Sequence, residues 1–101
     1  MSALHALSDP TRQRIVEMLA TGALSSGEIA GRFKLSPPAI SQHLKALREA
    51  RLVSVRTDRQ RRIYSLDPAG LAEVADWVER IKAFWNRKLD GLETALKRDA
   101  P

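Results

Sequence analysis

The 101-residue sequence predicts a mainly α-helical fold with one small β-hairpin. Three observations carry this prediction. Apolar residues recur every three or four positions along most of the chain, which is typical of amphipathic helices. Residues 53–66 instead alternate apolar and polar side chains on either side of a basic tip, which is typical of a hairpin. Capping residues and prolines stand where helices would begin. We therefore expect a single domain over residues 1–101.

The first part of the chain predicts two helices. Residues 2–7 are long enough for one or two helical turns. In the segment SDPTRQRIVEMLATG, Pro10 fits the first position of a helix and Gly22 fits its end. Either Ser8 or Asp9 can cap this helix, since both side chains accept hydrogen bonds from free backbone N–H groups.

The next segment, about residues 25–50, predicts a short helix, a tight break and a longer helix. Ser25 and Glu28 have the spacing of a capping box. Ser36 can cap the longer helix. The prolines that follow it fit the first helical turn, where no backbone N–H donor is needed. Its two faces differ: Ile40, Leu44 and Leu47 form an apolar face, and Ser41, Lys45 and Arg48, with Gln42 beside them, form a polar one.

A hairpin over about residues 53–66 precedes a final helix over about residues 68–98. Asp67 and Pro68 cap and begin this helix, and Gly70 predicts a loosened first turn. Apolar residues cover about half of its circumference, which is more than one small core needs. These are Leu71, Val74, Trp77, Val78, Ile81, Phe84, Trp85, Leu89, Leu92 and Leu96.

The net charge of +5 is unevenly distributed. Residues 1–67 contain 11 Lys and Arg against 6 Asp and Glu, whereas residues 68–101 contain 6 of each. Four arginines fall within seven positions of the hairpin, where they repel one another unless a polyanion is bound. The asymmetry favours a nucleic-acid partner. The alternative is a basic surface that only improves solubility.

Several classes of function are excluded by what the sequence lacks. It has no cysteine, no leader of the secretion type and no apolar run of about 18 residues, so we expect a cytoplasmic protein with no membrane contact. His5 and His43 fall on different helices, and neither has a plausible catalytic partner. We therefore expect no enzyme activity, no cofactor and no metal site.

The order of elements is that of a winged helix–turn–helix. In such a unit the second helix enters the major groove of DNA, and the basic hairpin forms the wing over adjacent phosphates or the minor groove. A protein-interaction module built on the same scaffold is the main alternative function. RNA binding is disfavoured because no aromatic stacking platform is present.

The segments ALSDPTRQRIVEML, GEIAGRFKLSPPAISQHLKALREARLV and RRIYSLDP resemble the ArsR family of bacterial repressors over roughly residues 4–98. The ending AFWNRKLDGLETAL resembles a metal-free branch of that family. The resemblance implies a homodimer, joined through its first and last helices, that binds an operator in double-stranded DNA and often represses its own operon. A small apolar effector near Trp77 and Trp85 is left open.

The resemblance also implies site residues. DNA contacts fall on Ser41, Gln42, His43 and Lys45 of the recognition helix and on Arg56, Arg59, Gln60, Arg61 and Arg62 of the wing. Arg48 either contacts a phosphate or pairs within its own helix. The dimer interface comprises Leu4, Leu7, Val74, Trp77, Val78, Ile81, Trp85, Leu89 and Leu92.

Some of these assignments have alternatives. His43 either contacts DNA or packs against the preceding helix, and Arg12 and Arg14 are either structural or functional. Two residues depart from the family pattern. Pro37 stands where many relatives have a glutamine that contacts a base, and Arg51 replaces the usual glycine after the recognition helix. If Arg51 has a positive φ, it carries a strain of about 1 kcal/mol that glycine would avoid.

Overall fold

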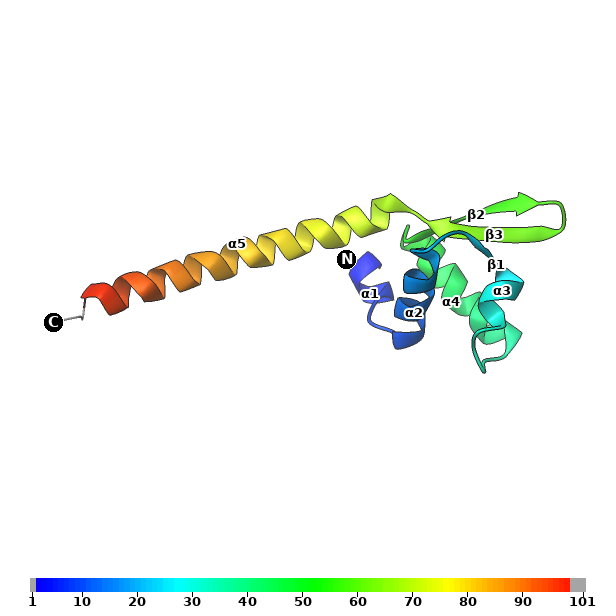
Figure 1. Cartoon of the computed structure of the whole chain (residues 1–101), viewed down its shortest axis with the longest axis horizontal. Coiled ribbons are helices and arrows are strands. Elements are labelled where there is room, and N and C mark those ends of the chain that lie inside the picture. Colours follow the sequence, from blue (N-terminus) through cyan, green and yellow to red (C-terminus); the bar gives the residue numbers. More distant parts are fainter. Residues whose placement is uncertain (1, 99–101) are drawn as a thin grey trace.

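A computed structural model describes residues 2–98 of the chain (Figure 1). Most of these residues are helical, and one hairpin is present, as the sequence predicts. The elements in order are α1 (Ser2–Ala6), α2 (Pro10–Leu19), β1 (Leu24–Ser25), α3 (Ser26–Ala30), α4 (Pro37–Glu49), β2 (Val53–Asp58), β3 (Arg61–Leu66) and α5 (Pro68–Arg98).

The helices begin where the sequence predicts, because the predicted caps are formed. The side chains of Asp9 and Ser36 each accept a hydrogen bond from the backbone N–H three residues further on, at 3.1 and 3.3 Å. Ser25 and Glu28 form the reciprocal capping box, with bonds of 3.1 and 3.0 Å. Each cap satisfies donors that the first helical turn leaves free.

The core lies between α1, α2, α3, α4 and the sheet. The apolar face predicted for α4 is buried: Ile40 and Leu44 are 3% exposed and Leu47 is fully buried. Leu52, just after α4, is also fully buried in this cluster. Other residues that are less than 2% exposed and belong to the same cluster are Ala3, Ile15, Ile29 and Val53.

The sheet has three strands in the order β1–β3–β2, all antiparallel. The hairpin pairs Val53 with Leu66 at one end and Asp58 with Arg61 at the other. Strand β1 was not predicted, because two residues are too short to show a period. It makes β3 the central strand, so its neighbouring residues Ile63 and Tyr64, on opposite faces of β3, are both buried.

Arg51 follows α4 and has a φ of +57°, so the left-handed conformation considered for this position is confirmed. The backbone N–H groups of Arg51 and Leu52 donate to the carbonyls of Arg48 and Leu47, both at 3.0 Å. This is the Schellman pattern, which closes the end of a helix. Helix α4 therefore has a tightly defined end despite the arginine in the glycine position.

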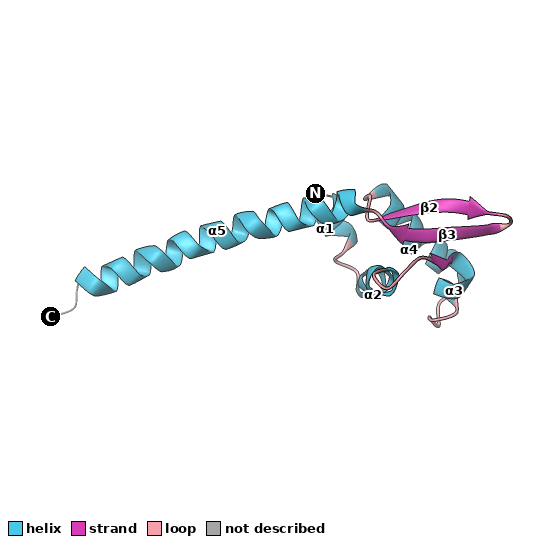
Figure 2. Cartoon of the chain, turned by 45° about the horizontal axis from the view of Figure 1, so that its top comes forward, coloured by secondary structure: helices cyan, strands magenta, loops and turns pink. Residues whose placement is uncertain are grey.

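Helix α5 is one unbroken helix of 31 residues, about 46 Å long. It leaves the body at one end and the β2–β3 hairpin leaves at the other, in both views (Figures 1 and 2). The molecule is accordingly elongated, at 73 × 25 × 23 Å. Within residues 2–98, none of the helices is both long and apolar enough to cross a membrane.

The prediction that Gly70 loosens the first turn of α5 is wrong. The helix is continuous from Pro68, and Gly70 is buried. Its N–H donates to the carbonyl oxygen of Arg51 at 2.7 Å, and the N–H of Asp67 donates to the carbonyl oxygen of Leu52 at 2.9 Å. Glycine serves here to allow a close approach between two backbones.

Candidate nucleic-acid interface

The polar face of α4 is free of the body. Ser41, Gln42, Lys45 and Arg48 are all exposed. The only ion pair recorded for this face joins Lys45 Nζ to Glu49 Oε1 at 4.0 Å, and both groups are well solvated. A pair of this kind contributes little and exchanges readily for another anion. These four side chains therefore remain available to a partner.

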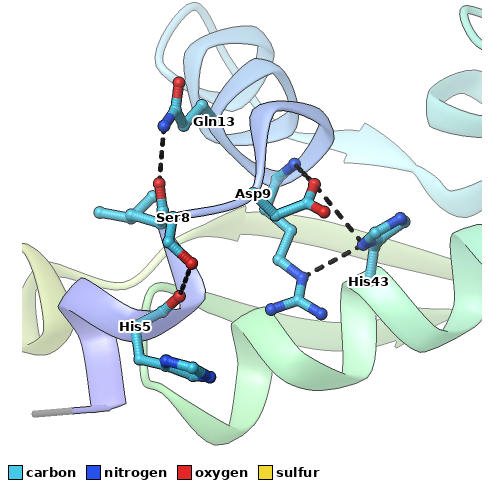
Figure 3. Close-up of polar contacts among 7 residues, drawn as sticks. His5, Ser8, Asp9, Gln13 and His43 are labelled. Carbon is cyan, nitrogen blue, oxygen red and sulfur yellow. Dashed lines mark hydrogen bonds and ion pairs between the residues drawn. The ribbon is translucent and has the colours of Figure 1, made fainter.

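His43 lies differently from its neighbours. Its side chain is 19% exposed and packs against the start of α2, where its Nδ1 accepts a 3.1 Å hydrogen bond from Nε of Arg12 (Figure 3). Oδ1 of Asp9 lies 4.0 Å from the same nitrogen. The side chain therefore packs within the fold, as the alternative to DNA contact supposes, but it packs against α2 and not against α3, the helix that directly precedes α4. Its contact with DNA stays a prediction.

Asp9 supplies the negative charge of this cluster. The backbone N–H of Arg12 donates to the carboxylate and lowers the pKa of Asp9 below its ordinary value of 3.8, and His43 adds a smaller effect in the same direction. Nearby, the side chains of Ser8 and Gln13 bond to the backbone of α1 and its following turn, both at 2.7 Å (Figure 3). The junction of α1 and α2 beside His43 is thus fixed by several polar contacts.

The wing presents its predicted residues to solvent: Arg56, Arg59, Gln60, Arg61 and Arg62 are all exposed. Arg59 and Gln60 form the two-residue loop between β2 and β3. Arg59 has a φ of +59°, a conformation that glycine or asparagine normally occupies in such tight turns. The side chain at the tip is therefore an arginine in a strained backbone position.

Two wing arginines have partners within the chain. Nη2 of Arg61 donates to Oε1 of Glu28 at 2.9 Å, and the guanidinium of Arg62 lies 5.8 Å from the ring centre of Tyr64. The backbone and side chain of Ser25 lower the pKa of Glu28 below its ordinary value of 4.5, and Arg61 lowers it further. The positive charge of Arg61 is therefore balanced in the free protein, which the sequence did not indicate.

The recognition helix and the wing converge on a hollow of about 210 Å³. It is lined by Ser41, Lys45 and Arg48 of α4 and by Arg62 and Tyr64 of β3. A second hollow of about 330 Å³ shares Ser41, Arg62 and Tyr64 and reaches Ser26 and Gly27 at the start of α3. Three cations on one concave surface are suited to bind phosphate oxygens.

Sequence reasoning missed the part played by Tyr64 in this surface. The alternating pattern of residues 53–66 marks this tyrosine only as a strand position. The spacing of Arg62 and Tyr64, two residues apart on one strand and so on one face of the sheet, is the signal that indicates their contact.

The structure assigns contacts to the two arginines whose roles were open. Arg12 bonds to His43, and the guanidinium of Arg14 lies 4.8 Å from the ring centre of Phe33. Both therefore brace α2 against neighbouring elements. Within residues 2–98, no three His, Asp or Glu side chains gather closely enough to hold a metal ion.

Comparison with known proteins identifies the family. The family model described as "Bacterial regulatory protein, arsR family" matches residues 9–55. HTH-type transcriptional regulator Rv2034 of Mycobacterium tuberculosis is 51% identical over 89 residues, which are 88% of this chain and 80% of that protein. The chain belongs to the ArsR family.

Two further similar proteins cover most of the chain. Transcriptional repressor SdpR of Bacillus subtilis is 38% identical over 77 residues, or 76% of this chain and 86% of that one. The crystal structure of a possible transcriptional regulator for arsenical resistance has 39% identity and a TM-score of 0.75, covering 100% of this chain and 98% of the other. This ArsR-family protein is a DNA-binding transcription regulator and not an enzyme.

Proposed function

We propose that this ArsR-family regulator is a cytoplasmic homodimer that binds an inverted repeat in double-stranded DNA and represses transcription there, including that of its own gene. The observation that carries the DNA-binding part is the convergence of exposed cations from α4 and β3 on one concave surface. The repressor assignment is supported by similarity to a relative that is named a repressor.

In this proposal the polar face of α4 lies in the major groove. Ser41 and Gln42, near the start of the helix, face base edges, because the first turns of a recognition helix reach deepest into the groove. Lys45 and Arg48 lie further along and contact phosphates, which take most protein–DNA hydrogen bonds. Pro37 cannot supply the base contact that many relatives make with a glutamine.

The wing contributes phosphate or minor-groove contacts. Arg59 and Gln60 at the tip and Arg56 on β2 carry the free polar groups, whereas Arg62 joins Lys45 and Arg48 around the shared hollow. Arg61 contacts DNA only by exchanging Glu28 for a phosphate. That exchange costs little, since the Arg61–Glu28 pair is 60% and 50% exposed.

The homodimer is supported by the apolar side chains that α5 exposes. Ile81 is 47%, Trp85 is 60% and Leu92 is 57% exposed, and an apolar surface of this extent on a small protein marks an interaction site. Helix α1 packs beside α5, and Leu4 of α1, Leu7 just after it, and Val74 and Trp77 of α5 are all half-buried. A two-fold dimer of this kind presents two recognition helices about 34 Å apart.

Transcription in vitro tests this function. The template is the promoter region of the protein's own gene, and footprinting is run on the same fragment. We expect repression together with two protected major-groove segments about one helical turn apart. Activation of the promoter, or a single protected segment, would contradict the repressor and dimer parts respectively.

A further inference from the structure

The end of the recognition helix and the start of α5 are joined backbone to backbone. The carbonyl oxygens of Arg51 and Leu52 accept the N–H groups of Gly70 and Asp67 at 2.7 and 2.9 Å. On one side of this junction the Schellman bonds fix the end of α4. On the other side Asp67 Oδ1 accepts the N–H of Ala69 at 2.9 Å and so fixes the first turn of α5.

Gly70 sets how closely the two helices approach. A Cβ atom at this position would lie 2.5 Å from the carbonyl oxygen and 2.7 Å from the carbonyl carbon of Arg51, and 2.8 Å from the carbonyl oxygen of Ala50. All three atoms are backbone, so no side-chain rotation relieves the contact. Reaching an ordinary contact of 3.4 Å requires α5 to move about 0.9 Å relative to α4.

A shift at this junction is carried along the whole length of α5. Helix α5 continues from Gly70 to Arg98 without a break, and its exposed apolar residues begin two turns after the junction. A change in the angle at Gly70 therefore turns the recognition helix relative to the apolar face that the partner covers in the proposed dimer. The junction itself transmits such a shift to both helices, because close-packed atoms have low compressibility.

We propose that Gly70 is a positioning residue that sets the half-site spacing of the operator, by fixing the angle between the recognition helix and the dimerisation helix. The inference rests on the proposed function, since it requires a dimer that binds an inverted repeat. It predicts that a Cβ atom at residue 70 changes which spacing is bound, while each half-site is still read by the same side chains.

The test compares Gly70→Ala with Gly91→Ala in the full chain. Gly91 is a matched control, because it lies on the same helix and a Cβ atom there has nothing within 4 Å. Each variant selects its preferred duplexes from a random-sequence pool, and the spacing of the enriched inverted repeats is read by sequencing. Sedimentation and thermal unfolding of the same samples record the dimer and the fold.

We expect wild type and Gly91→Ala to enrich the same spacing, and dimeric Gly70→Ala to enrich another. Gly70→Ala should bind the wild-type duplex about tenfold or more weakly, the order of loss that one mismatched base pair causes. Its affinity for random duplex and its salt dependence should be unchanged, because the cations are untouched. A merely structural role for Gly70 would lower the melting temperature and leave the spacing alone.

An identical spacing for folded Gly70→Ala and wild type would overturn the inference. If Gly70→Ala does not fold, Ala69→Gly decides in its place, since it adds backbone freedom beside the junction without a steric contact. That variant should enrich a broader range of spacings, and an unchanged range would overturn the inference equally. If wild type itself enriches no inverted repeat, the proposed function is wrong, and the role of Gly70 that rests on it fails as well.

Discussion

The Nε–H group of Arg12 donates a hydrogen bond to Nδ1 of His43 and so ties α2 to the middle of the recognition helix. Because Nδ1 is the acceptor, neutral His43 carries its proton on Nε2. His43 is therefore held in one orientation by a residue outside the helix–turn–helix.

Arg12→Ala should release His43 and lower the free energy of unfolding by about 1 kcal/mol, the usual contribution of one such hydrogen bond. Operator affinity should fall as well, since α4 loses a brace. Arg14→Ala is the control, because it removes the contact with Phe33 on the same helix and leaves His43 in place. The ¹⁵N chemical shifts of the His43 ring report the tautomer. Equal shifts in wild type and Arg12→Ala would show that Arg12 does not orient the ring.

Arg59→Gly should stabilise the protein and weaken DNA binding at the same time. Glycine removes the strain of the positive φ, which is about 1 kcal/mol, but also removes a cation from the wing tip. The melting temperature should rise, and the salt dependence of DNA affinity should flatten by about 0.9 in log–log slope if Arg59 neutralises one phosphate. Arg59→Ala separates the two effects, because it removes the charge and keeps the strain. If Arg59→Gly binds DNA as tightly as wild type, Arg59 does not contact DNA.

The fold should lose stability in acid. The pKa values of Asp9 and Glu28 are lowered by hydrogen bonds in the folded chain, so each carboxylate stabilises the fold fully above its ordinary value, 3.8 or 4.5. That stabilisation is lost as the pH falls through these values toward the lower folded ones. Denaturant unfolding at pH values between 3 and 6 measures the loss. The variants Asp9→Asn and Glu28→Gln should each reduce the slope, and an unchanged slope in both would contradict the assignment.

Trp85→Asp should dissociate the proposed dimer without unfolding the chain. The indole is 60% exposed within one chain, so the core does not depend on it, whereas a charge at the centre of an apolar interface is costly. Sedimentation at micromolar concentration, with circular dichroism for the fold, measures both. Ala83→Asp is the control, because residue 83 is exposed on the opposite side of the same helix. If Trp85→Asp remains a dimer, the dimer interface does not include this face of α5.

The sequence predicts the elements well and their junctions poorly. Helix starts at Asp9, Ser25 and Ser36 depend on residues three positions apart, so the local pattern contains them. The role of Gly70 depends on the backbone of Arg51, 19 residues away, and a glycine near a helix start reads locally only as a weak point.

The candidate site shows the same division between local and distant contacts. Periodicity along α4 separates its exposed face from its buried one. The contacts from Arg12 to His43 and from Arg61 to Glu28 span 31 and 33 residues, and no short-range spacing indicates them.

The most direct test of the proposed DNA binding is the salt dependence of binding to duplex DNA from the region upstream of the protein's own gene, measured by fluorescence anisotropy. In the proposed complex each protomer offers Lys45, Arg48 and the wing arginines to phosphates, so affinity should fall steeply with salt, at a log–log slope of about −0.9 per neutralised phosphate. Gln42→Ala should alter the preferred sequence and keep this slope. The double variant Arg59→Ala and Arg61→Ala should weaken binding to all duplexes and should make the log–log slope with salt less steep. Binding that does not depend on salt, or no binding to that region or to any other genomic fragment, would contradict the proposed function.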